Sequence, residues 1–201
     1  WGLQVSVMLD SNGSNTTAAA AVRAATKHLD LGATRALVLG GTGPVGQRVA
    51  LLLAREGAHV RIGSRTVQRA ESVCKVIQDK VPHAKVEAVS AATSSDGERA
   101  LDGRDLVIAA GAAGALLLPK KLRAACKTLR LAIDLNAVPP VGVEGVEITD
   151  KAVDRDGCLC YGAIGVGDIK MKIHRAAIAQ LFERNDQFLD AEQIYDLALR
   201  L

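Results

Sequence analysis

The sequence predicts an α/β fold of the doubly wound, Rossmann-like type, in which helices cover both faces of one parallel sheet. From residue 35 onward, short continuous apolar runs alternate with helical patterns. Such strands are typical of a parallel sheet that is buried on both faces. A glycine-rich loop at residues 40–46 directly follows the first of these runs and opens a helical pattern. That order is typical of the dinucleotide-binding version of the fold.

The first 30 residues differ from the alternating part that follows. Residues 3–9 are rich in Val and Leu and predict a short strand, a polar turn follows at residues 10–14, and an alanine-rich run over residues 15–29 predicts a helix. We interpret residues 1–30 as the strand, loop and linking helix between this fold and a preceding domain.

Residues 31–165 are predicted to form the dinucleotide-binding, Rossmann-like domain. Its strands are expected at 35–39, 59–62, 85–89, 105–109 and 130–133. Its helices are expected at about 44–56, 67–80, 96–101 and 119–127. Parallel neighbours need crossover connections, and these helices supply them. Residues 134–162 contain Pro139-Pro140 and several glycines, so we expect mainly loops there.

Residues 166–201 are predicted to be helical. One helical pattern extends from Val166 to Glu183 and a second from Asp190 to Leu201, and Asp190 with Gln193 resembles a capping box. We expect these C-terminal helices to pack back towards an N-terminal substrate domain that this chain lacks.

Composition excludes several classes of protein. The chain has 201 residues, 49% of them hydrophobic, which suffices for an ordinary core. The formal net charge is only +3, and the five aromatic residues (one Trp, two Tyr and two Phe) are scattered. A groove for single-stranded nucleic acid needs stacking rings beside a basic surface, so we expect no nucleic-acid partner.

The sequence also gives no sign of a membrane or metal site. No apolar stretch is long enough to cross a membrane, and the N-terminus has neither the basic start nor the cleavage site of a signal peptide. We therefore expect a cytoplasmic protein without a membrane partner. Of the four cysteines, only Cys158 and Cys160 are close in sequence, and their spacing is poor for zinc, so we expect reduced thiols and no metal.

The glycine-rich loop predicts a pyrophosphate site. Gly41, Gly43 and Gly46 fit the pattern Gly-x-Gly-x-x-Gly, in which glycines allow a tight turn, a close approach of the pyrophosphate and close helix–strand packing. The N–H groups and positive dipole end of the following helix would hold the phosphates. The alternative is a glycine turn that merely packs. The predicted cofactor residues in this loop are Gly41, Thr42, Gly43, Pro44, Val45 and Gly46.

The end of the second strand of the alternation favours NADP over NAD. An NAD site usually has an Asp or Glu there for the ribose hydroxyls, whereas this strand ends in Ser64 and Arg65. A hydroxyl and a guanidinium suit the 2′-phosphate of NADP. The alternative is an arginine that is only solvated, and a mixed cofactor preference stays open.

Two further strand ends are candidates for the nicotinamide half of the cofactor. In an open parallel sheet the ligand lies beyond the carboxyl ends of the strands. The small residues Ala110 and Gly111 would let the nicotinamide ribose lie against the backbone, and Asn136 ends the fifth strand at the same crevice. Either segment could instead simply cap a turn.

The helix that follows Gly165 and Gly167 carries the candidate catalytic residue. Lys170 and His174 are four residues apart and so share one face, and Lys170 lies close to the positive end of the helix dipole. A basic helix face in water is the alternative. The dispersed histidines and carboxylates predict neither a catalytic triad nor a carboxylate pair.

Several stretches carry a resemblance to a known family. They are Val7–Ala20 (VMLDSNGSNTTAAA), Gly41–Gly46, Asn136–Pro140, Gly162–Gly167, Lys170, Lys172, His174-Arg175 and Leu181–Glu183. The chain thereby resembles the NADP-dependent methylene-tetrahydromethanopterin dehydrogenases of methylotrophic bacteria. The run Asp10–Thr17 is far more specific than the glycine loop, and members of the family carry a further N-terminal domain.

The resemblance implies a function in one-carbon (formaldehyde) metabolism. It implies hydride transfer from methylene-tetrahydromethanopterin, and in some members methylene-tetrahydrofolate, to NADP⁺, giving the methenyl form and NADPH. The family's essential lysine aligns with Lys170. The pterin cleft would be lined by Asp10, Asn12, Gly13 and Thr16. The expected partners are the small pterin and further copies of the chain in a homo-oligomer.

Two other functions stay open. One is an NADP-dependent reductase of a ring carbonyl, similar to shikimate dehydrogenase, although this leaves the run Asp10–Thr17 unexplained. The other is an NADP-binding module without catalysis. An assay of the full-length protein with methylene-pterin and NADP⁺ separates the three.

Overall fold

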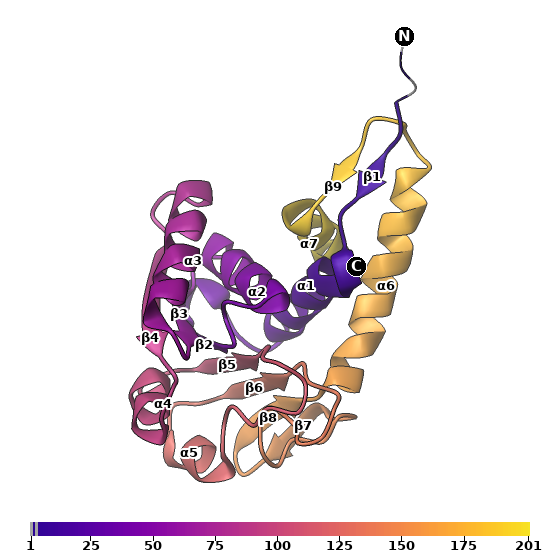
Figure 1. Ribbon diagram of the computed structural model, residues 1–201. Coiled ribbons are helices and arrows are strands. Elements are labelled where there is room, and N and C mark those ends of the chain that lie inside the picture. Colours follow the sequence, from indigo (N-terminus) through magenta and orange to yellow (C-terminus); the bar gives the residue numbers. More distant parts are fainter. Residues whose placement is uncertain (1, 3) are drawn as a thin grey trace.

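The computed structural model describes residue 2 and residues 4–201 and has a seven-stranded sheet at its centre (Figure 1). The strands are β1 (Val7–Met8), β2 (Arg35–Leu39), β3 (His59–Ser64), β4 (Lys85–Ser90), β5 (Leu106–Ala109), β6 (Leu131–Asp134), β7 (Lys151–Arg155), β8 (Cys158–Tyr161) and β9 (Phe188–Leu189). The helices are α1 (Ser14–Ala25), α2 (Pro44–Arg55), α3 (Val67–Lys80), α4 (Ser94–Leu101), α5 (Lys120–Ala125), α6 (Ala163–Leu181) and α7 (Ala191–Leu199). Two 3-10 turns are η1 (Ser11–Gly13) and η2 (Leu31–Ala33).

The sheet confirms the doubly wound α/β prediction. Its strand order is β4-β3-β2-β5-β6-β8-β7, so the chain proceeds outward from β2 in one direction and then returns to build the other half from β5. All neighbours pair in parallel except β7 and β8. The order in which strands are added to the sheet reverses between the parallel neighbours β2 and β5, where Leu37 pairs with Val107. Ligands of such sheets bind at this switch point, beyond the carboxyl ends of the strands.

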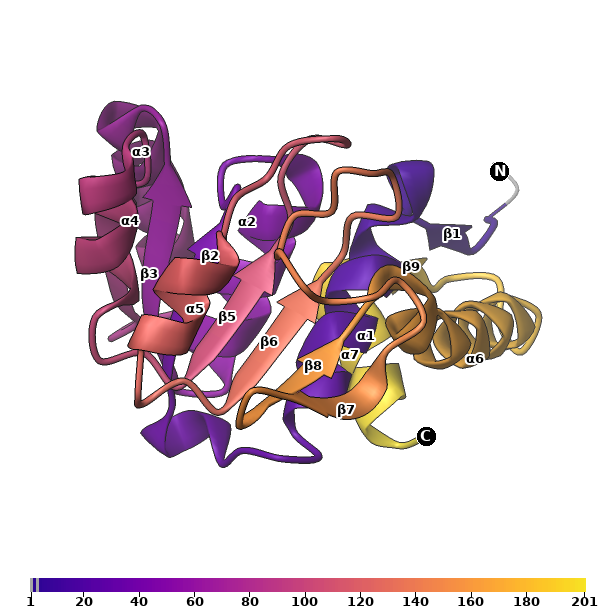
Figure 2. The same cartoon turned by 90° about the horizontal axis from the view of Figure 1, so that it is seen from below.

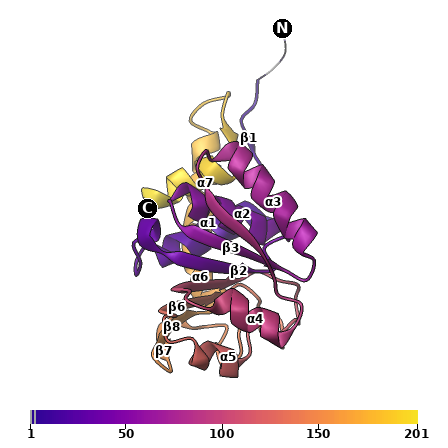
Figure 3. The same ribbon diagram turned by 90° about the vertical axis from the view of Figure 1, so that its left-hand side faces the viewer.

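Successive side chains of each strand enter two different cores, as the two-residue period of a strand requires. Val38 and Ile108 belong to the core beneath α1, α2, α3, α6 and α7, whereas Leu37 and Val107 belong to the core beneath α4 and α5. Figure 3 shows these two helical layers from the side, with α4 and α5 on one side of the sheet and α1, α2 and α3 on the other.

Helix α1, the linking helix of the predicted segment 1–30, is part of the core of this fold. Every residue from Ala18 to Val22 is fully buried, as are Ala24 and Ala25. The small alanine side chains let α2, α6 and α7 pack closely around α1. Much of the first 30 residues therefore stabilises the dinucleotide-binding fold itself.

The predicted strand at residues 3–9 is shorter in the structure, and Leu3 lies outside the described residues. Val7 and Met8 pair in parallel with Phe188 and Leu189 of β9, a strand that we did not predict. Figure 2 shows this two-stranded ribbon apart from the main sheet and beside α6. The ribbon ties the start of the chain to its end.

The expectation of loops over 134–162 is wrong for its second half. There β7 and β8 form an antiparallel hairpin, and β8 extends the sheet next to β6 by pairing Leu159 with Leu131. The sequence KAVDR of β7 is charged because this strand is half exposed at the sheet edge, so it lacks the apolar run that marks the other strands.

The C-terminal helices are close to the prediction. Helix α6 begins at Ala163, before the predicted start at Val166, and α7 has the predicted capping box of Asp190 and Gln193. Among the described residues, no helix combines the length and the apolar composition that crossing a bilayer requires.

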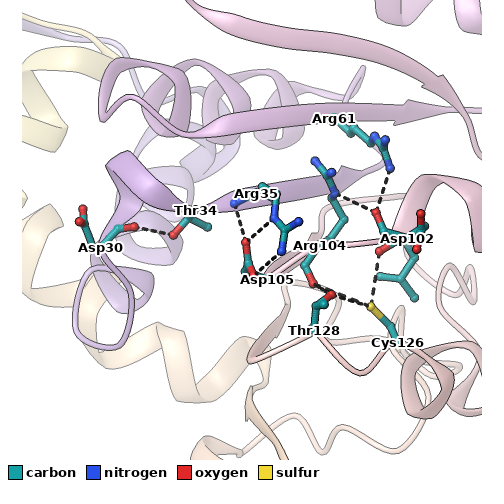
Figure 4. A network of polar contacts seen from close by, with 10 residues as sticks. Asp30, Thr34, Arg35, Arg61, Asp102, Arg104, Asp105, Cys126 and Thr128 are labelled. Carbon is teal, nitrogen blue, oxygen red and sulfur yellow. Dashed lines mark hydrogen bonds and ion pairs between the residues drawn. The ribbon is translucent and has the colours of Figure 1, made fainter.

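Polar contacts hold the amino ends of the strands together (Figure 4). Arg35, which begins β2, donates from its backbone N and from Nε to Oδ2 of Asp105, at 2.9 and 3.1 Å. Arg61 and Arg104 both donate to the backbone oxygen of Asp102, each at 3.2 Å. This end of the sheet is thus held by contacts within the protein, and the glycine-rich loop lies at the opposite end.

Candidate cofactor and substrate site

A cavity of about 910 Å³ lies beyond the carboxyl ends of β2, β3 and β5. It coincides with the switch point of the sheet, where the fold is expected to bind its ligand. Seven of the predicted cofactor residues line it, namely Thr42, Gly43, Pro44, Ser64, Arg65, Ala110 and Gly111. Gly41, Val45, Gly46 and Asn136 are not among its lining residues.

The glycine loop is built around Gly40, which the sequence pattern missed. Gly40 has φ +70°, and a Cβ built on it would lie 2.6 Å from the backbone of Gly111. Gly41, to which we assigned the tight turn, instead allows close packing on β3, because its Cβ would lie 2.6 Å from Cγ2 of Ile62. Gly46 has the predicted packing role, since a Cβ there would overlap the carbonyl oxygen of Gly40.

The first turn of α2 lies at the cavity. Gly43 is the N-cap residue of this helix and supplies no side-chain cap, and Pro44 begins the helix. Both residues line the cavity. The N–H groups at a helix start attract anions, so this turn can hold a pyrophosphate.

Two arginines lie at the cavity after the end of β3. Arg65 is exposed at the cavity, and Arg69, one helical turn further along in α3, lines it as well. The Ser64 hydroxyl accepts from the backbone N of Thr66 at 3.2 Å, so its own proton stays available to a ligand. We did not predict Arg69, which comes from the first turn of α3.

Asn136 shapes a loop next to the cavity. Its Nδ2 donates to the carbonyl oxygen of Pro140 at 3.2 Å, and its Oδ1 accepts from the backbone N of Val138 at 3.0 Å. The neighbouring Asp134 carboxylate is buried and accepts from backbone N–H groups of this loop. Burial nevertheless raises the pKa of Asp134.

The predicted substrate residues form a tight turn before α1. Oδ1 of Asp10 accepts from the backbone N atoms of Asn15 and Thr16 at 2.8 and 3.0 Å, and its Oδ2 accepts from the Thr16 hydroxyl at 2.7 Å. Asn12 and Gly13 both have positive φ, 53° and 67°. Asp10 therefore caps the helix, and the turn presents the backbone of Asn12 and Gly13.

Helix α6 brings the candidate catalytic residue to this turn. Nζ of Lys170 lies 2.6 Å from the position that a Cβ on Gly13 would take. His174, on the same face of α6, has its Nδ1 3.8 Å from Oδ2 of Asp10. Lys170 is half buried, whereas Lys172 is exposed. The structure thus brings Lys170 and the predicted turn together, from opposite ends of the chain.

Comparison with known proteins gives one family match. The shikimate/quinate 5-dehydrogenase family model matches residues 23–153. This range includes the glycine loop, β3 and the cavity, but it includes neither the Asp10 turn nor Lys170.

Two curated relatives come from Methylorubrum extorquens. The bifunctional protein MdtA is 43% identical over 199 residues, which cover 97% of this chain and 68% of that protein. An NAD(P)-dependent methylenetetrahydromethanopterin dehydrogenase is 28% identical over 205 residues, which cover 97% of this chain and 69% of that protein. Both alignments include the Asp10 turn and the region of Lys170, since they cover nearly the whole chain.

Solved structures share the fold. A transhydrogenase from Sinorhizobium meliloti has a TM-score of 0.60 and 18% identity, with 92% of this chain and 53% of that chain covered. The quinate dehydrogenase from Corynebacterium glutamicum in complex with NAD has a TM-score of 0.58 and 18% identity, with 94% and 62% covered. The chain thus spans just over half to about three fifths of the length of these two structures.

Proposed function

The chain belongs to the shikimate/quinate 5-dehydrogenase family of NAD(P)-dependent oxidoreductases. Within this family, we propose that it transfers a hydride from methylene-tetrahydromethanopterin to NADP⁺. The products are the methenyl form and NADPH, and methylene-tetrahydrofolate is a second substrate. The observation that carries the proposal is the position of Lys170 over the Asn12-Gly13 turn. These two segments carry the pterin-dehydrogenase resemblance, and the 28% identical relative is named for this reaction.

The lining of the cavity supports NADP as the cofactor. Among the described residues, no Asp or Glu lines the cavity, whereas Arg65 and Arg69 both line it. Two guanidinium groups would pair with a 2′-phosphate through charge-assisted hydrogen bonds, and Ser64 would donate a third hydrogen bond. The first turn of α2 would hold the pyrophosphate. When bound, the cofactor supplies the acceptor for the hydride.

For hydride transfer from this substrate, the main task of the protein is to orient the pterin. The methylene carbon lies between two nitrogen atoms, whose lone pairs stabilise the cation that remains when the hydride leaves. No proton is removed in that step, so the site needs no general base. Lys170 and the backbone of the Asn12-Gly13 turn would orient the pterin ring, and orientation of this kind can supply a large share of a rate enhancement.

A ring-carbonyl reductase similar to shikimate dehydrogenase is the second candidate, and the family match over residues 23–153 favours it. That match is confined to the part of the chain that binds the dinucleotide. It leaves the Asp10 turn and Lys170 without a role, whereas the pterin proposal uses both.

The test is a substrate panel with the full-length protein. Reduction of NADP⁺ and NAD⁺ is followed by absorbance with methylene-tetrahydromethanopterin, methylene-tetrahydrofolate, shikimate and quinate. We expect turnover with the two methylene compounds and a preference for NADP⁺. Turnover with shikimate or quinate alone would establish the second candidate, and cofactor binding without any turnover would support a non-catalytic module.

A further inference from the structure

The side chain of Asn15 connects three parts of the protein from a fully buried position. Asn15 is 1% exposed. Its Nδ2 donates to the carbonyl oxygen of Leu9 and to Oδ1 of Asp190, the latter at 2.8 Å, while its Oδ1 accepts from Nε of Arg48. Both amide protons and the amide oxygen are therefore paired, and an apolar residue of similar size could not replace these contacts.

Arg48 extends this connection to the cofactor loop. It lies on α2, and its Nη1 donates to the carbonyl oxygen of Pro44 at 2.8 Å. Pro44 begins α2 and lines the cavity. One guanidinium thus bridges the first turn of the phosphate-binding helix and the amide of Asn15.

At its other end the connection reaches the turn that faces Lys170. The backbone N of Asn15 donates to Asp10, and Asp10 fixes the turn by accepting three hydrogen bonds. Nζ of Lys170 lies over Gly13 of the same turn. A continuous series of contacts therefore joins the cavity wall to the candidate substrate turn.

We infer that Arg48 and Asn15 are positioning residues, which hold the Asp10–Gly13 turn at a fixed distance from the cofactor loop. The inference rests on the proposed function, because it assumes a hydride donor at the turn and an acceptor in the cavity. Hydride transfer requires the reacting atoms to be about 3–3.5 Å apart, and a misplacement of about 1 Å can cost two orders of magnitude in rate. Loss of either residue should thus affect turnover much more than cofactor binding.

Helix α2 offers a matched control. Arg55 lies two turns beyond Arg48 and connects α2 to α7, through Oδ1 of Asp196 at 2.6 Å and the carbonyl oxygen of Glu192 at 3.3 Å. Both of these partners belong to α7. Arg55→Ala therefore removes an interhelical connection of the same type and leaves the Asn15 contacts in place.

The experiment compares wild type, Arg48→Ala and Arg55→Ala in the full-length protein. Three quantities are measured: the Kd of NADPH by fluorescence, kcat with methylene-tetrahydromethanopterin, and amide hydrogen exchange of residues 9–16 with NADPH bound. We expect Arg48→Ala to lower kcat about 10- to 100-fold, to change the Kd less than about twofold, and to accelerate exchange over 9–16. Arg55→Ala should change neither kcat nor this exchange.

Asn15→Ala, alone and combined with Arg48→Ala, tests whether Asn15 and Arg48 act through the same contact. Since Asn15 is buried, this variant is used only if it unfolds cooperatively like wild type, and Arg48→Ala otherwise decides alone. The double variant should lose no more turnover than the worse single variant, because both substitutions break the same connection.

Several results would overturn the inference. An unchanged kcat in Arg48→Ala would do so, as would an equal loss in Arg55→Ala. If wild type binds NADPH but oxidises neither methylene compound, the proposed function fails and hydrogen exchange decides the positioning role. In that case faster exchange over 9–16 in Arg48→Ala alone supports the connection, and unchanged exchange refutes it.

Discussion

Nζ of Lys170 lies over the backbone of Gly13, so close that a Cβ on Gly13 would be only 2.6 Å away. Gly13 has φ +67°, which also favours glycine. The contact joins α6 to the turn before α1. Both residues come from segments that resemble the pterin dehydrogenases. They are far apart in sequence, and the fold brings them together.

The first prediction contrasts two lysines of α6. Lys170→Ala should reduce kcat by two or more orders of magnitude, about 2.7 kcal/mol of barrier, with a nearly unchanged Kd for NADP⁺. Lys172→Ala should have little effect, because Lys172 is exposed. Steady-state kinetics of the two variants check this. Similar kinetics for both would remove Lys170 from the mechanism.

The second prediction concerns Gly13. Gly13→Ala would displace the Lys170 amine and strain the backbone. Its kcat should be at least tenfold lower than that of a control variant that only strains the backbone. Gly157→Ala is the control, because Gly157 has φ +82° but no heavy atom within 4 Å of a built Cβ. Each substitution should cost about 1–2 kcal/mol of stability, measured by denaturant unfolding. Equal activity in the two variants would show that the Lys170–Gly13 contact is unimportant.

The third prediction tests cofactor choice. Arg65→Ala should weaken the binding of NADP⁺ about 10- to 100-fold, since a charge-assisted hydrogen bond contributes roughly 1.5–3 kcal/mol. Arg69→Ala should act in the same direction, and NAD⁺ affinity should barely change in either. Titration of both dinucleotides gives the answer, and equal losses for NADP⁺ and NAD⁺ would contradict the assignment of these arginines to the 2′-phosphate.

The fourth prediction concerns acid stability at the opposite end of the sheet. Burial raises the pKa of Asp105, but hydrogen bonds from Arg35 outweigh it, so the pKa is below its usual value. As the pH falls, the Asp105 carboxylate therefore takes up a proton in the unfolded state at a higher pH than in the folded state. Asp105 stabilises the fold above the unfolded-state value of about 3.9, and this contribution disappears as the pH falls through the folded-state pKa.

Asp105→Asn should accordingly lose stability at neutral pH and show a flatter decline of the free energy of unfolding between about pH 5 and pH 2. Asp79→Asn, at an exposed position on α3, is the control. Denaturant unfolding at several pH values checks the result. A curve for Asp105→Asn parallel to that of wild type would contradict the role of the Arg35 pair.

Much of the fold was predictable because its signals are local. The apolar run Arg35–Leu39, the glycine loop behind it and the capping box at Asp190 each combine residues close in sequence with one physical requirement. The alanine run of α1 predicted a helix, but alanine gives little direction to a helix surface, so the burial of α1 among α2, α6 and α7 did not follow.

The parts that sequence reasoning missed depend on distant partners. Two-residue strands such as β9 have too few residues for a pattern and exist because β1 pairs with them. Gly40 carries the turn with φ +70° and lies against Gly111, whereas Gly41 lies against Ile62, and neither distant neighbour can be read from the local pattern. The Asn15–Arg48 contact likewise joins residues that share no local pattern. The sequence named candidate residues one by one, and it gave no sign of the contacts that connect them.

Direct transfer of hydrogen from substrate to cofactor tests the central claim most directly. The full-length protein is mixed in a single turnover with NADP⁺ and methylene-tetrahydromethanopterin that carries two deuterium atoms on the methylene carbon. The proposal predicts that one deuterium moves to the nicotinamide, giving deuterated NADPH by mass spectrometry, while the methenyl product keeps the other. Unlabelled NADPH, or no reduction of NADP⁺ by a protein that binds it, would contradict the proposal.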